Sequence, residues 1–148
     1  MYQSILVPVD GSDTSTRGLR EAIRLAQGNH ARLRLVHVVN TAVIAMEYAA
    51  ALGPMEDFEN AAREDGEAVL RLAADFVREN GLQSESVLLG TASDNTGELI
   101  VAQAQEWPAD VIVMGTHGRR GLRRLVLGSN AEYVLRHTTV PVVLVREH

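Results

Sequence analysis

Residues 111–129 read VIVMGTHGRRGLRRLVLGS, and this stretch decides the fold of the chain. A short apolar run ends abruptly at Gly115, a second glycine follows at Gly118, and after nine further residues Gly128 and Ser129 precede a helical pattern. The order of strand, glycine-rich loop and helix start is typical of a backbone that wraps its N–H groups around a phosphate. The loop also carries four arginines and no acidic residue. The stretch therefore predicts an anion site at the end of a buried strand.

Outward from this stretch, apolar runs and helical patterns alternate along the whole chain. Parallel strands need crossover helices, and right-handed crossovers place those helices on both faces of one sheet. The pattern predicts an open, doubly wound, five-stranded parallel α/β sheet of Rossmann-like type with strand order 3-2-1-4-5. In that order the carboxyl ends of the first and fourth strands face one crevice. The predicted strands are residues 4–9, 33–39, 86–89, 111–114 and 142–146.

The predicted helices follow from apolar spacing and end signals. Asn95 to Glu98 and Ser129 to Glu132 each have the spacing of a capping box. Residues 40–54 are expected to be a loop with a helical turn near 45–52. A long helix is predicted over residues 55–80 and a last helix over residues 129–137. The predicted buried faces are Leu19, Ala22, Ile23 and Ala26 in the first helix, Phe58, Ala62, Val69, Ala73 and Phe76 in the long helix, and Ile100, Ala104 and Trp107 in the third helix.

Length and composition narrow the class of protein. The 148 residues, 46% hydrophobic and 22% charged, fit a single globular domain over residues 1–148. There is no cysteine, and the net charge of −5 argues against nucleic-acid binding. The start has no signal-peptide pattern, and no stretch approaches the roughly 20 apolar residues that cross a bilayer, so we expect a cytoplasmic protein without a membrane partner. The histidine spacing suggests no protein-bound metal.

Five short motifs together resemble the universal stress protein family, and in particular its ATP-binding branch. The resemblance covers the whole chain, and it implies the fold of the adenine nucleotide alpha hydrolase group. The glycine motif, which the branch without nucleotide usually lacks, is intact here. The motifs are ILVPVD at residues 5–10, LVHV at 35–38, VMGTHG at 113–118, LGS at 127–129 and VPVVLV at 140–145.

This resemblance implies an adenine nucleotide as ligand: ATP, with or without Mg²⁺, or else AMP or cyclic AMP. The first-strand residues would line the adenine and ribose pocket, the Val38 backbone would pair with the adenine edge, and the glycine loop and last helix would hold the phosphates. The implied binding residues are Pro8, Val9, Asp10, Val38, Met114, Gly115, His117, Gly118, Arg119, Gly128, Ser129 and Asn130.

Physical chemistry supports the phosphate end of this site. Gly115 and Gly118 permit positive φ and lack the Cβ atoms that would block a phosphate. The start of the last helix points free N–H groups at an anion, and arginine forks neutralise several oxygens at once. A carboxylate repels phosphates, so Asp10 fits only the sugar or the base.

Several of these residues also have structural interpretations. Ser129 can serve only as a cap, Asp10 can cap the first helix, and Arg119 can be a solvated loop residue. Arg123 and Arg124 can be surface charge or partners for the acidic long helix. His117 reads as structural or peripheral rather than as an acid–base catalyst, and His37 as a packed histidine.

The function predicted from these features is a regulatory, stress-response module with no catalytic residue and at most slow ATP turnover. ATP would order residues 116–127 and change a surface that an unknown regulatory protein reads. The hydrophobic edge strand from Val140 to Val145 predicts a homodimer. Two alternatives are a nucleotidyl- or phosphotransferase that uses His117 and the arginines, and a dimeric scaffold that holds no nucleotide.

Overall fold

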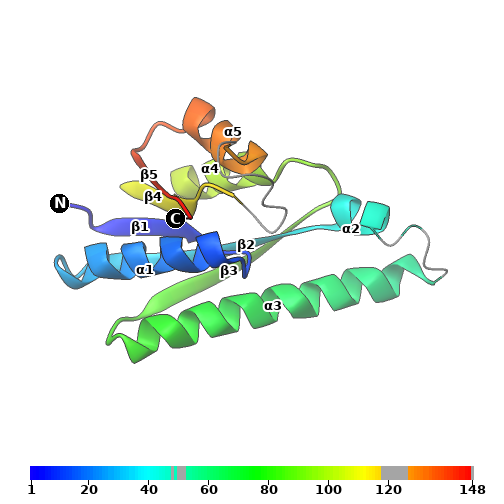
Figure 1. The fold of residues 1–148 in the computed structure, drawn as a ribbon, viewed down its shortest axis with the longest axis horizontal. Coiled ribbons are helices and arrows are strands. Elements are labelled where there is room, and N and C mark those ends of the chain that lie inside the picture. The colour runs from blue at the N-terminus through cyan, green and yellow to red at the C-terminus, as the bar shows by residue number, and fades with distance from the viewer. Residues whose placement is uncertain (48, 50–52, 118–126, 148) are drawn as a thin grey trace.

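The computed structural model describes residues 1–47, 49, 53–117 and 127–147. Within them, five parallel strands form one sheet in the order β3-β2-β1-β4-β5, which confirms the predicted topology. Helices α1 and α3 cover one face of the sheet, and α4 and α5 cover the other (Figure 1). The strands are β1 Ser4–Pro8, β2 Arg32–Asn40, β3 Ser84–Thr91, β4 Val111–Gly115 and β5 Val142–Val145; the helices are α1 Asp13–Gln27, α2 Thr41–Glu47, α3 Met55–Glu79, α4 Thr96–Glu106 and α5 Ser129–His137.

Two elements differ from the prediction by more than one residue at an end. Strand β3 is longer at both ends, because its polar first residues, Ser84 and Glu85, continue the ladder opposite Leu33 and Arg34 of β2. Helix α2 occupies residues where a loop was expected, and it begins directly after β2. Apolar periodicity missed both, since a partly exposed edge strand and a short surface helix bury few apolar side chains.

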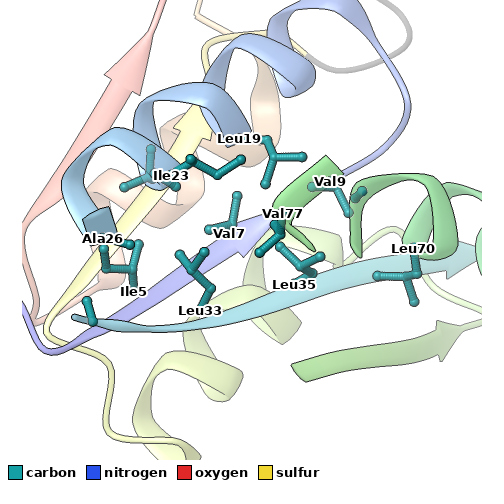
Figure 2. Packing of buried hydrophobic residues seen from close by; sticks show 14 of the residues in the cluster. Ile5, Val7, Val9, Leu19, Ile23, Ala26, Leu33, Leu35, Leu70 and Val77 are labelled. Atoms are coloured by element: carbon teal, nitrogen blue, oxygen red, sulfur yellow. The ribbon is translucent and has the colours of Figure 1, made fainter. Parts of the chain in front are cut away.

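The strands of the sheet carry apolar residues on both faces. On the face under α1 and α3, Val7 of β1 and Val9, just after β1, pack with Leu35 of β2 (Figure 2). On the other face, Leu6 of β1 and Val36 of β2 pack with residues of α4 and α5. Burial on both faces is typical of a central parallel sheet, and it makes β1 and β4 rigid supports for the loops that follow them.

The predicted faces of α1 and α4 are buried as expected, whereas that of α3 was partly wrong. Val69 and Ala73 of α3 are buried, but Phe58, Ala62 and Phe76 are only half-buried. The beginning of α3 extends past the ends of the strands and has no strand to cover there, whereas Phe76, in the second half, packs against the core while it stays partly exposed (Figure 1). The buried residues of α3 are Gly66, Val69, Leu70, Ala73 and Val77.

The predicted capping box at the start of α4 was wrong. Asn95 is the N-cap residue, but its side chain makes no cap hydrogen bond. Its Oδ1 atom instead accepts from the Thr91 hydroxyl, which ties the end of β3 to the start of the helix. No helix among the described residues is long and apolar enough to span a bilayer.

Candidate functional site

The candidate site lies at the carboxyl edge of the sheet, where the strand order reverses. Strand β1 pairs with β2 on one side and with β4 on the other, so the loops after β1 and β4 leave in opposite directions. The structure brings to this edge the end of β1, the second half of β2, the end of β4 and the start of α5 (Figure 1). The predicted binding residues in the described chain belong to these four segments.

At the end of β1, Val9 is held by two hydrogen bonds to β2. Its N–H donates to the carbonyl oxygen of Val36 at 2.8 Å, and its own carbonyl oxygen lies 2.7 Å from Nδ1 of His37. The Val9 side chain is 5% exposed and belongs to the core beneath α3. His37 is buried, which confirms that it is a packed histidine.

Asp10 closes the turn between β1 and α1. Its Oδ1 atom accepts from the backbone N–H of Ser12 at 2.8 Å, and its own N–H donates to the Ser15 hydroxyl at 3.0 Å. The N-cap of α1 is Ser12, whose side chain accepts from the N–H of Ser15. The alternative that Asp10 caps this helix was therefore wrong, because Asp10 lies two residues before the N-cap Ser12.

Gly115, at the end of β4, is required by packing and not by its φ angle. Among the described glycines only Gly11 and Gly81 have positive φ, so Gly115 does not use the positive φ that a glycine permits. A Cβ at Gly115 would lie 2.8 Å from the carbonyl carbon of Thr14, and one at Gly18 would lie 3.2 Å from the backbone nitrogen of Gly115. Two glycines thus let α1 lie directly against the end of β4. Sequence reasoning missed Gly18, although a glycine inside a helix is itself a sign of close packing.

Gly128 holds the start of α5 against the end of β4. Its N–H donates to the carbonyl oxygen of Thr116 at 2.7 Å, and a Cβ on Gly128 would lie 2.8 Å from that oxygen. Thr116 is anchored in turn, because its N–H donates to Val145 of β5 at 3.0 Å. The two ends of the glycine-rich loop are therefore fixed to each other and to the sheet.

Within the described residues, the first turn of α5 has no side-chain cap. Gly128 is the N-cap residue, so Ser129 is the first residue of the helix and is exposed. Glu132 pairs with Arg136 at 2.9 Å. The predicted capping box was therefore wrong, since Ser129 lies inside the helix and not at its cap. The backbone N–H groups ahead of the first intrahelical bond, from Glu132 to Gly128, are oriented out of the helix start.

His117 follows Thr116 at the beginning of the loop. Its Nδ1 atom lies 2.9 Å from the Thr116 hydroxyl, and its carbonyl oxygen accepts from the hydroxyl of Thr14. Its Nε2 atom is buried, and no described residue offers it a hydrogen-bond partner. An unpartnered buried polar atom costs free energy, so it is a candidate ligand contact.

The remaining predicted binding residues fall into three groups. Gly118 and Arg119, together with the other loop arginines, lie outside the described residues. Pro8 and Val38 are half-buried at the edge of the site, and Met114 is buried in the core beneath it. Asn130 is half-buried in the first turn of α5. Among the residues that the structure describes, no group of three histidine or acidic side chains could hold a metal ion.

The model of the universal stress protein family matches residues 1–146 of the chain. The chain belongs to the universal stress protein family. It is 33% identical to universal stress protein MJ0531 of Methanocaldococcus jannaschii over 99% of this chain and 84% of that one. It also resembles the solved structure of the universal stress protein UspA from Lactobacillus plantarum, with a TM-score of 0.81, 25% identity and 98% coverage of both chains.

Two further solved family members hold nucleotides. The universal stress protein from Archaeoglobus fulgidus in complex with dAMP has a TM-score of 0.67 and 25% identity and covers 98% of both chains. A universal stress protein in complex with cAMP has a TM-score of 0.68 and 25% identity, with 98% coverage of both chains.

Proposed function

We propose that this universal stress protein binds an adenine nucleotide, ATP foremost, at the carboxyl edge between β1 and β4. The observation that carries the proposal is the junction of Thr116 and Gly128, because it aims the start of α5, which no described side chain caps, across the end of β4. A helix start of this kind attracts phosphate oxygens. The dAMP and cAMP complexes of the two relatives support adenine nucleotides as the class of ligand.

The residues present fit such a ligand. The missing Cβ of Gly128 leaves the Thr116 carbonyl and the helix start in direct contact, and His117 Nε2 is a buried atom that a phosphate oxygen satisfies. On the other side of β1, the Val38 backbone and the Asp10 turn lie where base and sugar would bind. The carboxylate of Asp10 is compatible with sugar hydroxyls, and it would repel a phosphate. The nucleotide would therefore lie with its base at β2 and its phosphates at α5.

ATP binding would serve regulation more than hydrolysis. The chain has no lysine and hence no P-loop lysine to activate the γ-phosphate. Mg²⁺, if it enters with ATP, would be held mainly by phosphate oxygens, since the described residues supply no three-ligand cluster. Binding would instead change the surface of the glycine-rich loop, which a regulatory partner protein would recognise.

The experiment is calorimetric titration of the purified, nucleotide-stripped chain with ATP, AMP, cAMP and GTP, with and without Mg²⁺. We expect ATP to bind with at least tenfold higher affinity than GTP, because the peptide edge at Val38 recognises adenine. Mass spectrometry of material that co-purifies with the chain identifies the nucleotide held in the cell. A chain that binds none of the four nucleotides would overturn the proposal.

We further infer a homodimer through β5. This strand ends the sheet, and its four residues are only half-buried. Val142 and Leu144 direct their peptide groups away from β4, because the bonds to β4 use the alternate residues Pro141 and Val145. Free peptide groups on an apolar edge favour pairing with a second copy.

A further inference from the structure

Strand β2 continues past the end of β1, and His37 lies at the point where the two strands separate. The register pairs Pro8 with Val36, and the Val9 N–H then donates to the Val36 carbonyl. In a parallel ladder, alternate residues face the same neighbour. The next bond would therefore run from the Val38 N–H to the Val9 carbonyl oxygen.

That bond is absent from the backbone hydrogen bonds of the described residues. The Val9 carbonyl oxygen instead lies 2.7 Å from Nδ1 of His37. A carbonyl oxygen only accepts, so Nδ1 carries the proton and donates it. The buried imidazole thus takes the acceptor that the ladder would have used, and the Val38 peptide extends beyond β1 with its N–H and carbonyl toward the site.

A glycine in the middle of α3 makes room for this ring. A Cβ at Gly66 would lie 2.7 Å from Cδ2 of His37 and 2.9 Å from Cδ1 of Leu88. Glycine destabilises a helix interior relative to alanine, so its presence in this 25-residue helix needs a reason. The space for the His37 ring supplies that reason.

We propose that His37 is a positioning residue for adenine: by holding the Val9 carbonyl it ends the β1–β2 ladder and keeps the Val38 peptide edge open to the base. The proposal rests on the proposed function, because it concerns the base end of the same site. A peptide edge presents one donor and one acceptor side by side. Adenine presents the complementary pair, an acceptor ring nitrogen beside its amino group, whereas guanine carries a carbonyl oxygen in place of that amino group.

The test compares His37→Leu with His37→Asn. Both side chains place two atoms beyond Cγ, so their shapes match, but only asparagine offers an N–H at the same number of bonds from the backbone as Nδ1. In His37→Leu, the Val9 carbonyl oxygen loses its bond to His37 and accepts from the Val38 N–H instead. The β1–β2 ladder then extends by one hydrogen bond. With asparagine, the side chain keeps the carbonyl and the Val38 edge stays open.

The first measurement is amide hydrogen exchange in the nucleotide-free chain. We expect the Val38 amide of His37→Leu to be protected at least tenfold more than in the wild type, and His37→Asn to match the wild type. The second measurement is the ratio of ATP to GTP affinity. We expect this ratio to fall about tenfold in His37→Leu, with affinity for tripolyphosphate unchanged, and to be retained in His37→Asn.

A Gly66→Ala variant tests the position of the His37 ring by a change in α3, since the added methyl group displaces the ring. Gly28→Ala, where an added Cβ meets open space, is the control. Gly66→Ala should lower the ATP to GTP ratio, and Gly28→Ala should not. Unchanged Val38 exchange and an unchanged ratio in His37→Leu would overturn the proposal. A wild-type chain that binds no adenine nucleotide would overturn the proposed function, while Val38 exchange would still decide whether His37 ends the ladder.

Discussion

The amide nitrogen of Gly128 lies 2.7 Å from the carbonyl oxygen of Thr116, and this bond joins the start of α5 to the end of β4. No side chain larger than a hydrogen fits at Gly128 without moving that oxygen, because a Cβ would approach it to 2.8 Å. Thr116 cannot easily yield, since its own N–H is bonded to Val145 and its side chain is buried. The geometry of the proposed phosphate site therefore depends on one glycine.

We expect Gly128→Ala to weaken ATP binding at least tenfold and to lower the free energy of unfolding by about 1–3 kcal/mol, as overpacking does. The added methyl group pushes the helix start away from Thr116. Calorimetry and urea unfolding measure the two effects. Gly28→Ala is the matched control, since its Cβ meets nothing within 4 Å. Full ATP affinity in a folded Gly128→Ala chain would contradict the phosphate site.

Gly115→Ala should act mainly on stability. Its Cβ would lie 2.8 Å from the Thr14 carbonyl carbon, so α1 must move away from β4 at a cost of about 1–3 kcal/mol. Urea unfolding followed by circular dichroism measures the loss. Gly90→Ala in β3 serves as the control, because its Cβ also points into open space. Equal unfolding midpoints for the two variants would show that α1 and β4 are less tightly packed than described.

His117→Asn should stabilise the nucleotide-free chain and weaken nucleotide binding. Asparagine can keep the bond to the Thr116 hydroxyl, and it removes the buried, unpartnered Nε2 atom. We expect a gain of about 1 kcal/mol in the free energy of unfolding and about a tenfold loss of ATP affinity. Thermal unfolding with and without ATP measures both. A variant that loses stability without ATP would mean that the protein itself satisfies Nε2.

Val142→Pro should convert a dimer to a monomer with little effect on the fold. Its peptide N–H faces away from β4, so proline removes a donor only from the free edge. Light scattering at micromolar concentration measures the mass. Val143→Pro is the contrasting variant, because it removes a donor to β4 and should unfold the edge. A wild-type chain that is already monomeric at this concentration would refute the dimer.

Trp107 should report unfolding but not nucleotide binding. It is the single tryptophan, it is 7% exposed, and it lies under the guanidinium groups of Arg32 and Arg34 at 5.4 and 4.9 Å. Arg32 begins β2, so this cluster is at the amino edge of the sheet, opposite the proposed site. Saturating ATP should therefore leave the emission spectrum unchanged, and a clear spectral shift on ATP addition would indicate a different binding position.

Much of the fold could be read from local patterns. The apolar runs located all five strands, and the periodicity of α1 and α4 identified their buried faces, because a residue's side of a helix depends only on its spacing. The face of α3 was harder to predict. The position where a helix leaves its sheet depends on the length of strands elsewhere in the chain, and no local pattern contains that information.

The candidate site, like the fold, could be predicted from the sequence only in part. The glycine spacing predicted a strand-to-helix loop, but the reason for each glycine came from partners far along the chain, such as Thr14 for Gly115. The two capping boxes failed for different reasons: at α4 Asn95 is the N-cap residue, but its side chain accepts from the Thr91 hydroxyl instead of capping the helix. At α5 the tie to Thr116 made Gly128 the N-cap, and Ser129 became the first helical residue.

By itself, the sequence determined the alternation of strands and helices, the parallel sheet and the position of the glycine-rich loop, because these follow from apolar periodicity and from turn residues acting over a few positions. Only the tertiary structure decided that α1 lies against β4 through Gly18 and Gly115, and that the ring of His37 fills the space left by Gly66. Those contacts join segments that lie far apart along the chain, so they exist only once the sheet has brought those segments within van der Waals distance.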